Sequence, residues 1–447
     1  MASTSAGTTK VIIIGAGFAG LTAAIECVRH GHAVTLLESF AELRSLGDII
    51  SFGHNAGRIF RRWPGVEAAL DPICHDSKQL VFNRFDGAHL VTQVWEEADL
   101  RKNGGKKFNG HRGEIHRIVW EHAKSVGVDI KLGQKVSEYF EDEGQAGVVS
   151  NGQRYVADVV LAADGVRSTA RTIVLGYEDK PKSSGYAIWR AWFPSDELAK
   201  NPLTAPLVVN GDTHTGWLGR LGTSYLEWIV LKQDSGPEIH FLAASIKNGK
   251  DFSWVCTHKD EADVEESWSA PGRIEDAIEC LKDWCPEVHA IVRATPPDRL
   301  VDWKLVYRDP LPTWISPKRR IALIGDAAHP FLPTSIQGAS QAMEDGVTVA
   351  ICLELAGKEN AQEALLAYEK IRYDRVRAAQ KTGETTRDRW HKADFDKVES
   401  EPKAIKLPRE EWLLGHDAET HAYAVYAKTV EEIRKEKKGV PDVRSVL

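Results

Sequence analysis

Two periods of apolar residues follow each other near the start of the chain. The β-branched run Val11–Ile14 predicts a buried strand, and Leu21, Ile25 and Val28 then recur at helical spacing. A second apolar run follows at Ala33–Leu37. This order predicts a strand–helix–strand unit, the building block of a parallel sheet.

Later segments show both kinds of pattern. Short apolar strands are predicted at Val159–Ala162 and Ile321–Ile324, each followed by a small-residue turn that carries an aspartate. Between them, alternating aromatic segments such as Tyr186–Phe193 and Tyr225–Leu231 predict a mainly antiparallel sheet. The polar stretch Asn103–Gly110 predicts a loop. Helical periodicity predicts the helices Glu114–Ser125, Gln337–Leu355 and Glu363–Arg389.

Composition narrows the class of protein. The 447 residues include 57 Lys plus Arg and 64 Asp plus Glu, a formal charge of −7, which argues against nucleic acid as the main partner. With 43% hydrophobic and 27% charged residues, the chain has an ordinary globular composition. No internal repeat or flexible linker marks a boundary, so its two or three domains are expected to interleave.

No targeting segment is expected from the sequence. Its first residues lack the apolar core of a secretory signal, and no run approaches a membrane span. The ending Ser445–Leu447 is not a peroxisomal signal, so a soluble cytoplasmic protein is expected. Six cysteines without a CxxC pair predict reduced thiols and no metal site. The charged run Glu431–Lys438 predicts a solvated helix end.

A glycine motif lies where the first strand meets the first helix. Gly15-Ala-Gly17-Phe-Ala19-Gly20 matches GxGxxG, in which the glycines permit a tight turn, contact with a pyrophosphate and close helix packing. The helix N-terminus adds free N–H groups for phosphate. Glu38 ends the second strand, where a carboxylate accepts hydrogen bonds from an adenosine ribose. The motif therefore predicts an NAD or FAD site.

Further segments distinguish FAD from NAD. Arg112 lies just before a predicted helix, and Asp164-Gly165 opens the turn ADGVRSTAR. Asp326 and Pro330 belong to GDAAHP, which follows the strand IALI. With GxGxxG, these ordered motifs resemble the group A flavoprotein monooxygenases, the family of para-hydroxybenzoate and salicylate hydroxylases. The similarity runs from about residue 10 to residue 390.

The resemblance implies a fold and a division of the chain. It implies an α/β protein with a Rossmann-like FAD-binding domain, a mainly antiparallel substrate domain and C-terminal helices. The FAD-binding domain is expected at residues 1–180 and 301–395, the second part containing a long helix. The substrate domain is expected at 181–300, with 75–105 contributing to it, and a charged helical tail at 396–447.

Cofactor residues follow from the same resemblance and from one physical argument. Small residues at Gly338 and Ala339 allow a helix to bring its backbone against a flat ring, and its dipole favours negative charge on reduced flavin. The residues expected to bind FAD are Gly15, Gly17, Ala19, Gly20, Glu38, Arg112, Asp164, Gly165, Asp326, Pro330, Gly338 and Ala339. NADH or NADPH is expected as a transient co-substrate, since no second GxGxxG is present.

The implied reaction is aromatic hydroxylation. NAD(P)H reduces FAD, O2 forms a flavin hydroperoxide, and one oxygen passes to a phenolic, salicylate-like or other electron-rich ring held in a dry pocket. A base that forms phenolate would assist, and an imidazole suits this role. His54 and His214 are the candidates, whereas Arg190 and Tyr225 are candidates for substrate binding.

One loop departs from the family pattern. Many relatives carry GAGI and then PNA, whereas this chain reads Gly47-Asp-Ile-Ile50 and His54-Asn-Ala56. The change affects the expected shape of the active site and places His54 near the chemistry.

Several alternatives stay open on the sequence. Epoxidation, Baeyer–Villiger insertion and decarboxylative oxidation, including in secondary metabolism, use the same flavin chemistry. A non-oxygenating flavin oxidoreductase, or a flavin-binding protein without turnover, would share the cofactor motifs. Substrate identity and oligomeric state are not encoded in any motif.

Overall fold

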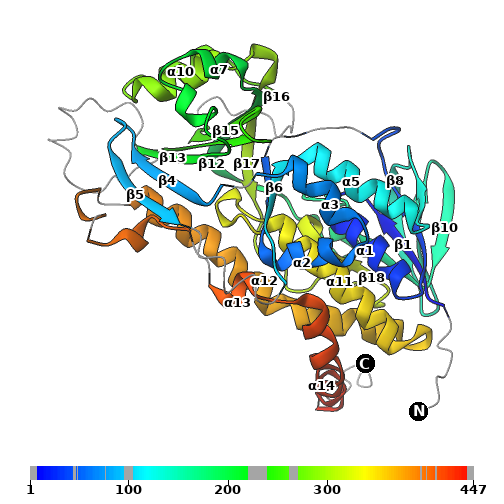
Figure 1. The fold of residues 1–447 in the computed structure, drawn as a ribbon. Coiled ribbons are helices and arrows are strands. Elements are labelled where there is room, and N and C mark those ends of the chain that lie inside the picture. Colours follow the sequence, from blue (N-terminus) through cyan, green and yellow to red (C-terminus); the bar gives the residue numbers. More distant parts are fainter. Residues whose placement is uncertain are drawn as a thin grey trace.

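The described part of the protein contains four sheets (Figure 1). The computed structural model describes residues 8–43, 47, 49–75, 77–94, 104–219, 239–260, 270–392, 395–398, 400–407 and 410–439. A parallel and a larger, mainly antiparallel sheet organise two regions of the chain. The predicted α/β architecture is therefore confirmed.

The parallel sheet has five strands and joins distant segments. In spatial order they are β18 (Ile321–Leu323), β11 (Val159–Ala162), β1 (Lys10–Ile14), β2 (Ala33–Leu37) and β7 (Asp129–Lys131). The β1–α1–β2 unit, with α1 at Phe18–Arg29, confirms the predicted strand–helix–strand order. Val11 and Ile13 face the helical layer, whereas Ile12 and Ile14 face a small antiparallel sheet. That sheet comprises β8 (Val136–Glu141), β9 (Ala146–Ser150) and β10 (Gln153–Ala157).

Helices α1 and α11 (Gly338–Ala356) pack closely against each other in the helical layer. A Cβ at Gly346 would lie 2.6 Å from the Ala23 nitrogen, so glycine permits this contact. Both helices are buried along most of their length because sheet and helices surround them. The other helices of this region are α2 (His54–Arg62), α3 (Val66–Leu70), α5 (Arg112–Ser125) and α6 (Ala170–Leu175).

The eight-stranded sheet carries the second region. In spatial order it comprises β16 (Ala270–Pro271), β17 (Leu300–Tyr307), β12 (Lys182–Pro194), β15 (Asp251–Lys259), β14 (Ile239–Ile246), β13 (His214–Gly219), β4 (Gln79–Arg84) and β5 (His89–Val94). All described pairs are antiparallel except β13 with β4, which confirms the mainly antiparallel prediction. One face packs against α7 (Asp196–Lys200), α9 (Ile274–Cys280) and α10 (Pro286–Ala294) (Figure 1).

The long helix α12 (Ala361–Lys392) connects the two regions. It packs against α11 and ends beneath the large sheet, where Trp390 contacts Phe82 and His240 (Figure 1). Helices α13 (Glu411–Leu414) and α14 (Ala418–Gly439) follow it, and α14 contains the charged run Glu431–Lys438. In the described parts of the chain, no helix combines the length and apolar character needed to cross a membrane.

Several element boundaries differ from the sequence predictions, and two of the differences have a clear local cause. The end of the predicted loop Asn103–Gly110 is a strand, β6 (Phe108–His111), because it pairs with β3 (Ile49–Phe52). Helix α5 begins at Arg112 rather than near Glu114, since the His111 side chain caps it by accepting from the Glu114 N–H at 3.3 Å. The predicted strand Tyr225–Leu231 lies outside the described residues.

Candidate functional site

The glycine motif forms a tight, open turn at the start of α1. Gly15 has φ +97°, and a Cβ there would lie 2.5 Å from the Ala163 carbonyl oxygen. A Cβ at Gly20 would lie 1.9 Å from the Gly15 oxygen, so glycine is needed for helix packing. A Cβ at Gly17, in contrast, would have nothing within 4 Å. Among the residues that the structure describes, no side chain caps α1 and no acid lies in its first turn, so this N-terminus suits a phosphate group.

Glu38 lies directly beside this turn. One carboxylate oxygen accepts from the Ala16 N–H at 2.8 Å, and the other accepts from the Phe40 N–H at 2.8 Å. These bonds fix the carboxylate at the end of β2, next to the glycine turn. The position fits a ribose-binding acid.

Other predicted motifs converge on the same turn. A Cβ at Gly325, in the GDAAHP segment, would lie 2.7 Å from the Ala19 Cβ. His116, one helical turn after Arg112, donates from Nε2 to the Ala16 carbonyl at 2.6 Å. His116 was missed in the sequence, although its spacing of four from Arg112 places both on one face of α5.

Arg112 and Asp326 lie within electrostatic reach of each other. Burial raises the pKa of Asp326, whereas the charges of His329 and Arg112 oppose that rise. His329 is held by Asp345, with Nε2 and Oδ2 2.5 Å apart. The histidine therefore shapes the GDAAHP turn, and Asp326 in that turn is only partly exposed.

Asp164 follows β11 and lies close to the glycine turn. Its Oδ2 accepts from the Tyr139 hydroxyl at 2.9 Å, and burial raises its pKa. Gly165 has φ +79°, which favours glycine in this turn. Tyr139 is a further residue that the sequence did not single out, because its strand pattern gives no sign of a distant carboxylate.

The start of α11 presents the predicted small residues. A Cβ at Gly338 would lie 3.2 Å from the Phe331 Cβ, and Ala339 is partly buried against the core. The Pro330 carbonyl accepts from Gln380 on α12 at 2.9 Å. GDAAHP, α11 and α12 thus meet at one place.

His54 lies beside this helix start and is buried. It is the first residue of α2, not a loop residue, because Gly53 provides the extended N-cap. The Gly53 N–H donates to the Ser340 hydroxyl at 3.1 Å, and Asn55 donates to the Gln337 side chain at 3.2 Å. These bonds bring His54 to the α11 turn, and its expected place near the chemistry stays a prediction.

A buried ionic network lies behind the α11 turn. Arg372 donates to Asp345 at 2.8 Å and also bonds Glu344, whose carboxylate accepts two bonds from Arg375, each 2.8 Å long. Asn55 donates to the same Glu344 carboxylate at 2.7 Å. Burial raises the pKa of Glu344, but the charges of Arg375 and Arg372 outweigh it, so the net direction is downward. Sequence reasoning missed this network, although two adjacent acids inside an apolar helix were a signal.

The large sheet presents Arg190 on the face opposite α7, α9 and α10. Its guanidinium carbon lies 4.9 Å from the centre of the Trp303 ring. Trp192 shares this face and contacts the His111 ring at 4.9 Å. Because His111 directly precedes Arg112, this face of the sheet is directed toward the nucleotide-binding region.

His214 belongs to the same face through strand register. Trp192 pairs with Ser253, Ser253 with Ala244, and Ala244 with His214. Burial and the nearby charges of His75 and Lys107 lower the pKa of His214 to about 3, so its neutral ring accepts protons poorly. The fourth candidate, Tyr225, lies outside the described residues.

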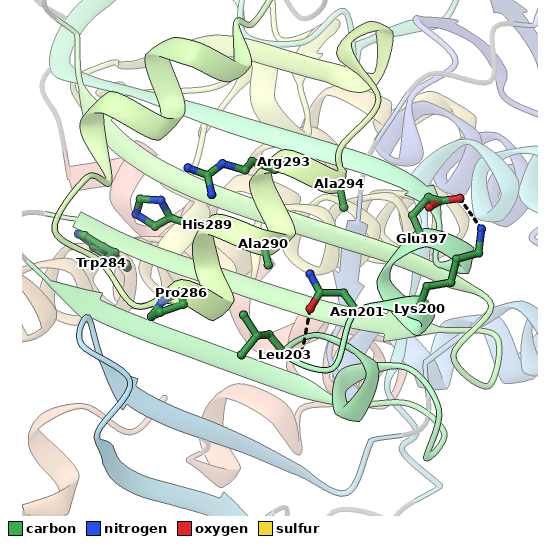
Figure 2. Close-up of a pocket in the computed structure, with 10 residues that line it drawn as sticks. All are labelled: Glu197, Lys200, Asn201, Leu203, Trp284, Pro286, His289, Ala290, Arg293 and Ala294. Atoms are coloured by element: carbon green, nitrogen blue, oxygen red, sulfur yellow. Dashed lines mark hydrogen bonds and ion pairs between the residues drawn. The ribbon is translucent and has the colours of Figure 1, made fainter.

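A separate groove of about 860 Å³ lies on the opposite side of this sheet (Figure 2). Trp284 and residues of α7 and α10, including His289 and Arg293, line it. Because it adjoins the helix-covered face, it is separated by the sheet from Arg190. The groove therefore does not belong to the nucleotide site.

Comparison with known proteins agrees with this geometry. Residues 10–94 match a family model described as FAD dependent oxidoreductase, and residues 311–382 match one described as FAD binding domain. Asperlicin C monooxygenase of Petromyces alliaceus is 37% identical over 438 residues, 95% of this chain and 90% of the relative. The chain belongs to the FAD-dependent monooxygenases.

Solved structures share the fold over nearly the whole chain. The crystal structure of CtdE in complex with FAD and a substrate has a TM-score of 0.85 and 34% identity, covering 96% of this chain and 100% of CtdE. A salicylate hydroxylase complex has a TM-score of 0.74 at 21% identity, with 93% and 97% of the two chains covered. The fold that the group A resemblance implied is thereby confirmed.

This monooxygenase binds FAD, and its residues fit that cofactor. The open space at Gly17, the uncapped α1 terminus and the adjacent Glu38 carboxylate suit a dinucleotide. Across the described residues, no group of three or more His, Cys, Asp or Glu side chains is arranged to hold a metal ion.

Proposed function

We propose that this monooxygenase uses NAD(P)H and O2 to add one oxygen atom to an electron-rich aromatic substrate. The main observation in support is the face of the large sheet formed by Arg190, Trp192 and Trp303. This face is aromatic, carries a buried cation, and is linked through His111 to Arg112. Aromatic surfaces of this kind suit a planar ligand.

The proposed substrate contacts follow from charge and shape. Arg190, whose guanidinium lies over the Trp303 ring, is placed to bind a phenolate, enolate or carboxylate oxygen. By favouring the ionised form of a phenol or enol, its charge would keep such a substrate electron-rich. When bound, FAD supplies the activation of O2 and the transfer of oxygen. His54, buried beside the α11 turn, is the proposed proton acceptor, and it is better placed than His214 with its lowered pKa.

The proposed FAD contacts divide among the converging motifs. Gly15, Gly17, Ala19 and Gly20 would hold the pyrophosphate, and Glu38 the adenosine ribose. The remaining proposed contacts are Arg112, Asp164, Gly165 and Asp326 toward the ribityl region, and Pro330, Gly338 and Ala339 near the flavin ring.

The test measures cofactor, reductant and product together. Purified protein with a flavin spectrum is mixed with NADH or NADPH and a panel of phenols, salicylates and indoles. Substrate-stimulated oxidation with a product heavier by one oxygen would support the proposal. Product structure would separate hydroxylation from epoxidation, Baeyer–Villiger insertion and decarboxylative oxidation. Flavin reduction without any oxygenated product would contradict it.

A further inference from the structure

A short C-terminal segment, defined as residues 410–417, covers the start of α2. A Cβ at Gly53, which precedes His54, would lie 3.0 Å from the Leu414 Cδ2 and 3.1 Å from the Gln337 Nε2. Leu413 and Leu414 also pack with Phe331, which follows Pro330 in the GDAAHP segment. The C-terminal segment therefore lies against the start of α2 and against the GDAAHP segment, whose Pro330 is proposed to lie near the flavin ring.

Arg375 holds this segment to the helical core. It donates to the carbonyls of Trp412 at 2.6 Å and Leu413 at 2.9 Å, while its other bonds reach Glu344. Arg58 of α2 donates to the Gly415 carbonyl on the far side. Arginine bonds to its main-chain oxygens, an ion pair between Arg62 and Asp417, and apolar packing of its leucines thus hold the segment in place.

Glu344 is the buried carboxylate to which Arg375 binds. Its side chain has 0% exposure and binds Arg372, Arg375 and Asn55 at once. His416 lies 3.8 Å from the carboxylate, but burial lowers the pKa of that histidine to about 4, so it is neutral at pH 7. A carboxylate buried this deeply needs its cationic partners, which makes the Glu344–Arg375 contact persistent.

We infer that Glu344, acting through Arg375, is a positioning residue that holds the C-terminal segment closed over the flavin side of the active site and excludes solvent there. The Glu344 carboxylate accepts hydrogen bonds from Asn55 at the start of α2 and from Gln341 near the start of α11. Through Arg375, it is also linked to the Leu413 carbonyl of the C-terminal segment. The inference rests on FAD binding and on the proposed placement of the flavin ring near Pro330, Gly338 and Ala339, and it needs no aromatic substrate.

The test measures solvent access to bound FAD in the holoenzyme. Arg375→Met removes the hydrogen bonds to the Trp412 and Leu413 carbonyls, and Glu344→Gln removes the negative charge that binds Arg375. A hydrogen bond to a charged donor shifts an equilibrium by about tenfold, so the open population should rise by about that factor. Hydrogen exchange of residues 410–417 and the iodide quenching constant of flavin fluorescence should rise accordingly in both variants. Because the two substitutions change local charge in opposite directions, attraction of iodide alone would move the constant in opposite directions.

Lys370→Met is the matched control. Lys370 also lies on α12 and binds Glu436 of α14 at 2.5 Å, away from the segment, so both readouts should stay at wild-type values. If Arg375→Met does not fold, Arg375→Lys keeps the charge with fewer donors and should show a smaller rise. Unchanged quenching in folded Arg375 and Glu344 variants, or changes of opposite sign, would overturn the inference. A panel without any oxygenated product would leave these results untouched and would count against the proposed substrate alone.

Discussion

Replacing Gly17 with alanine should separate FAD binding from folding. Gly17 has φ −69° and ψ 178°, which alanine adopts freely, and its Cβ would meet nothing within 4 Å. The fold should tolerate Gly17→Ala at about 1 kcal/mol, the usual effect of alanine at an N-cap. The same methyl group would project where the FAD pyrophosphate approaches the backbone. Loss of one charge-assisted hydrogen bond corresponds to ~2.7 kcal/mol, or about 100-fold weaker FAD binding.

Gly20→Ala should have the opposite effect, because it should weaken folding more than FAD binding. Alanine in a helix interior normally stabilises by about 1 kcal/mol relative to glycine. Here its Cβ would lie 1.9 Å from the Gly15 oxygen, a main-chain atom that cannot rotate away. We expect a net loss of about 2 kcal/mol or more, because α1 must move from the glycine turn.

Two measurements test the pair. Urea unfolding of the apoprotein gives the free energy of unfolding, and titration with FAD gives the dissociation constant. Gly17→Ala should change mainly the second quantity and Gly20→Ala should change the first. Wild-type FAD affinity in a folded Gly17→Ala protein would refute the placement of the pyrophosphate at this turn.

Three further outcomes are expected. Arg190→Met should lower kcat/KM for an anionic aromatic substrate by about 100-fold, with partial recovery in Arg190→Lys; an equal loss for neutral substrates would contradict a charge contact. The pKa of His214 is lowered from 6.5 to about 3, so wild-type unfolding free energy should fall as pH drops through that window, by up to ~1.4 kcal/mol per pH unit. His214→Gln should flatten this slope in urea unfolding, and an unchanged slope would contradict its burial. Arg372→Met leaves the buried carboxylates of Glu344 and Asp345 underpaired and should destabilise the fold by about 3 kcal/mol or more. Arg434→Met removes an exposed ion pair and should change stability by under about 1 kcal/mol. Equal effects of the two substitutions in thermal unfolding would argue against the buried ionic network.

Local sequence rules predicted the nucleotide-binding elements well. Gly15 and Gly20 occupy positions where a Cβ would meet main-chain atoms, so their spacing directly reflects the backbone. The strand at Val159–Ala162 appears with the same bounds, because a fully buried parallel strand must be apolar throughout.

Local sequence rules could not predict the contacts between distant segments. Arg372 and Glu344 lie 28 positions apart, and nothing in either helical pattern states that α11 and α12 face each other. His54 was placed near the chemistry, yet its position in a helix depends on the N-cap at Gly53. For Arg190, alternation identified the face it shares with Trp192, whereas the direction of that face required the contact with His111.

The order of strands in the parallel sheet constrains how the protein is made. β11 and β18 are hydrogen-bonded neighbours, although residues 163–320 separate them in the chain. A growing polypeptide therefore completes this sheet only after the whole large-sheet region has been synthesised. Until then the edge of β11 lacks its partner, and the early strands form an incomplete sheet that is prone to mispairing. Truncation between these strands should consequently yield an aggregating fragment rather than an independent nucleotide-binding domain.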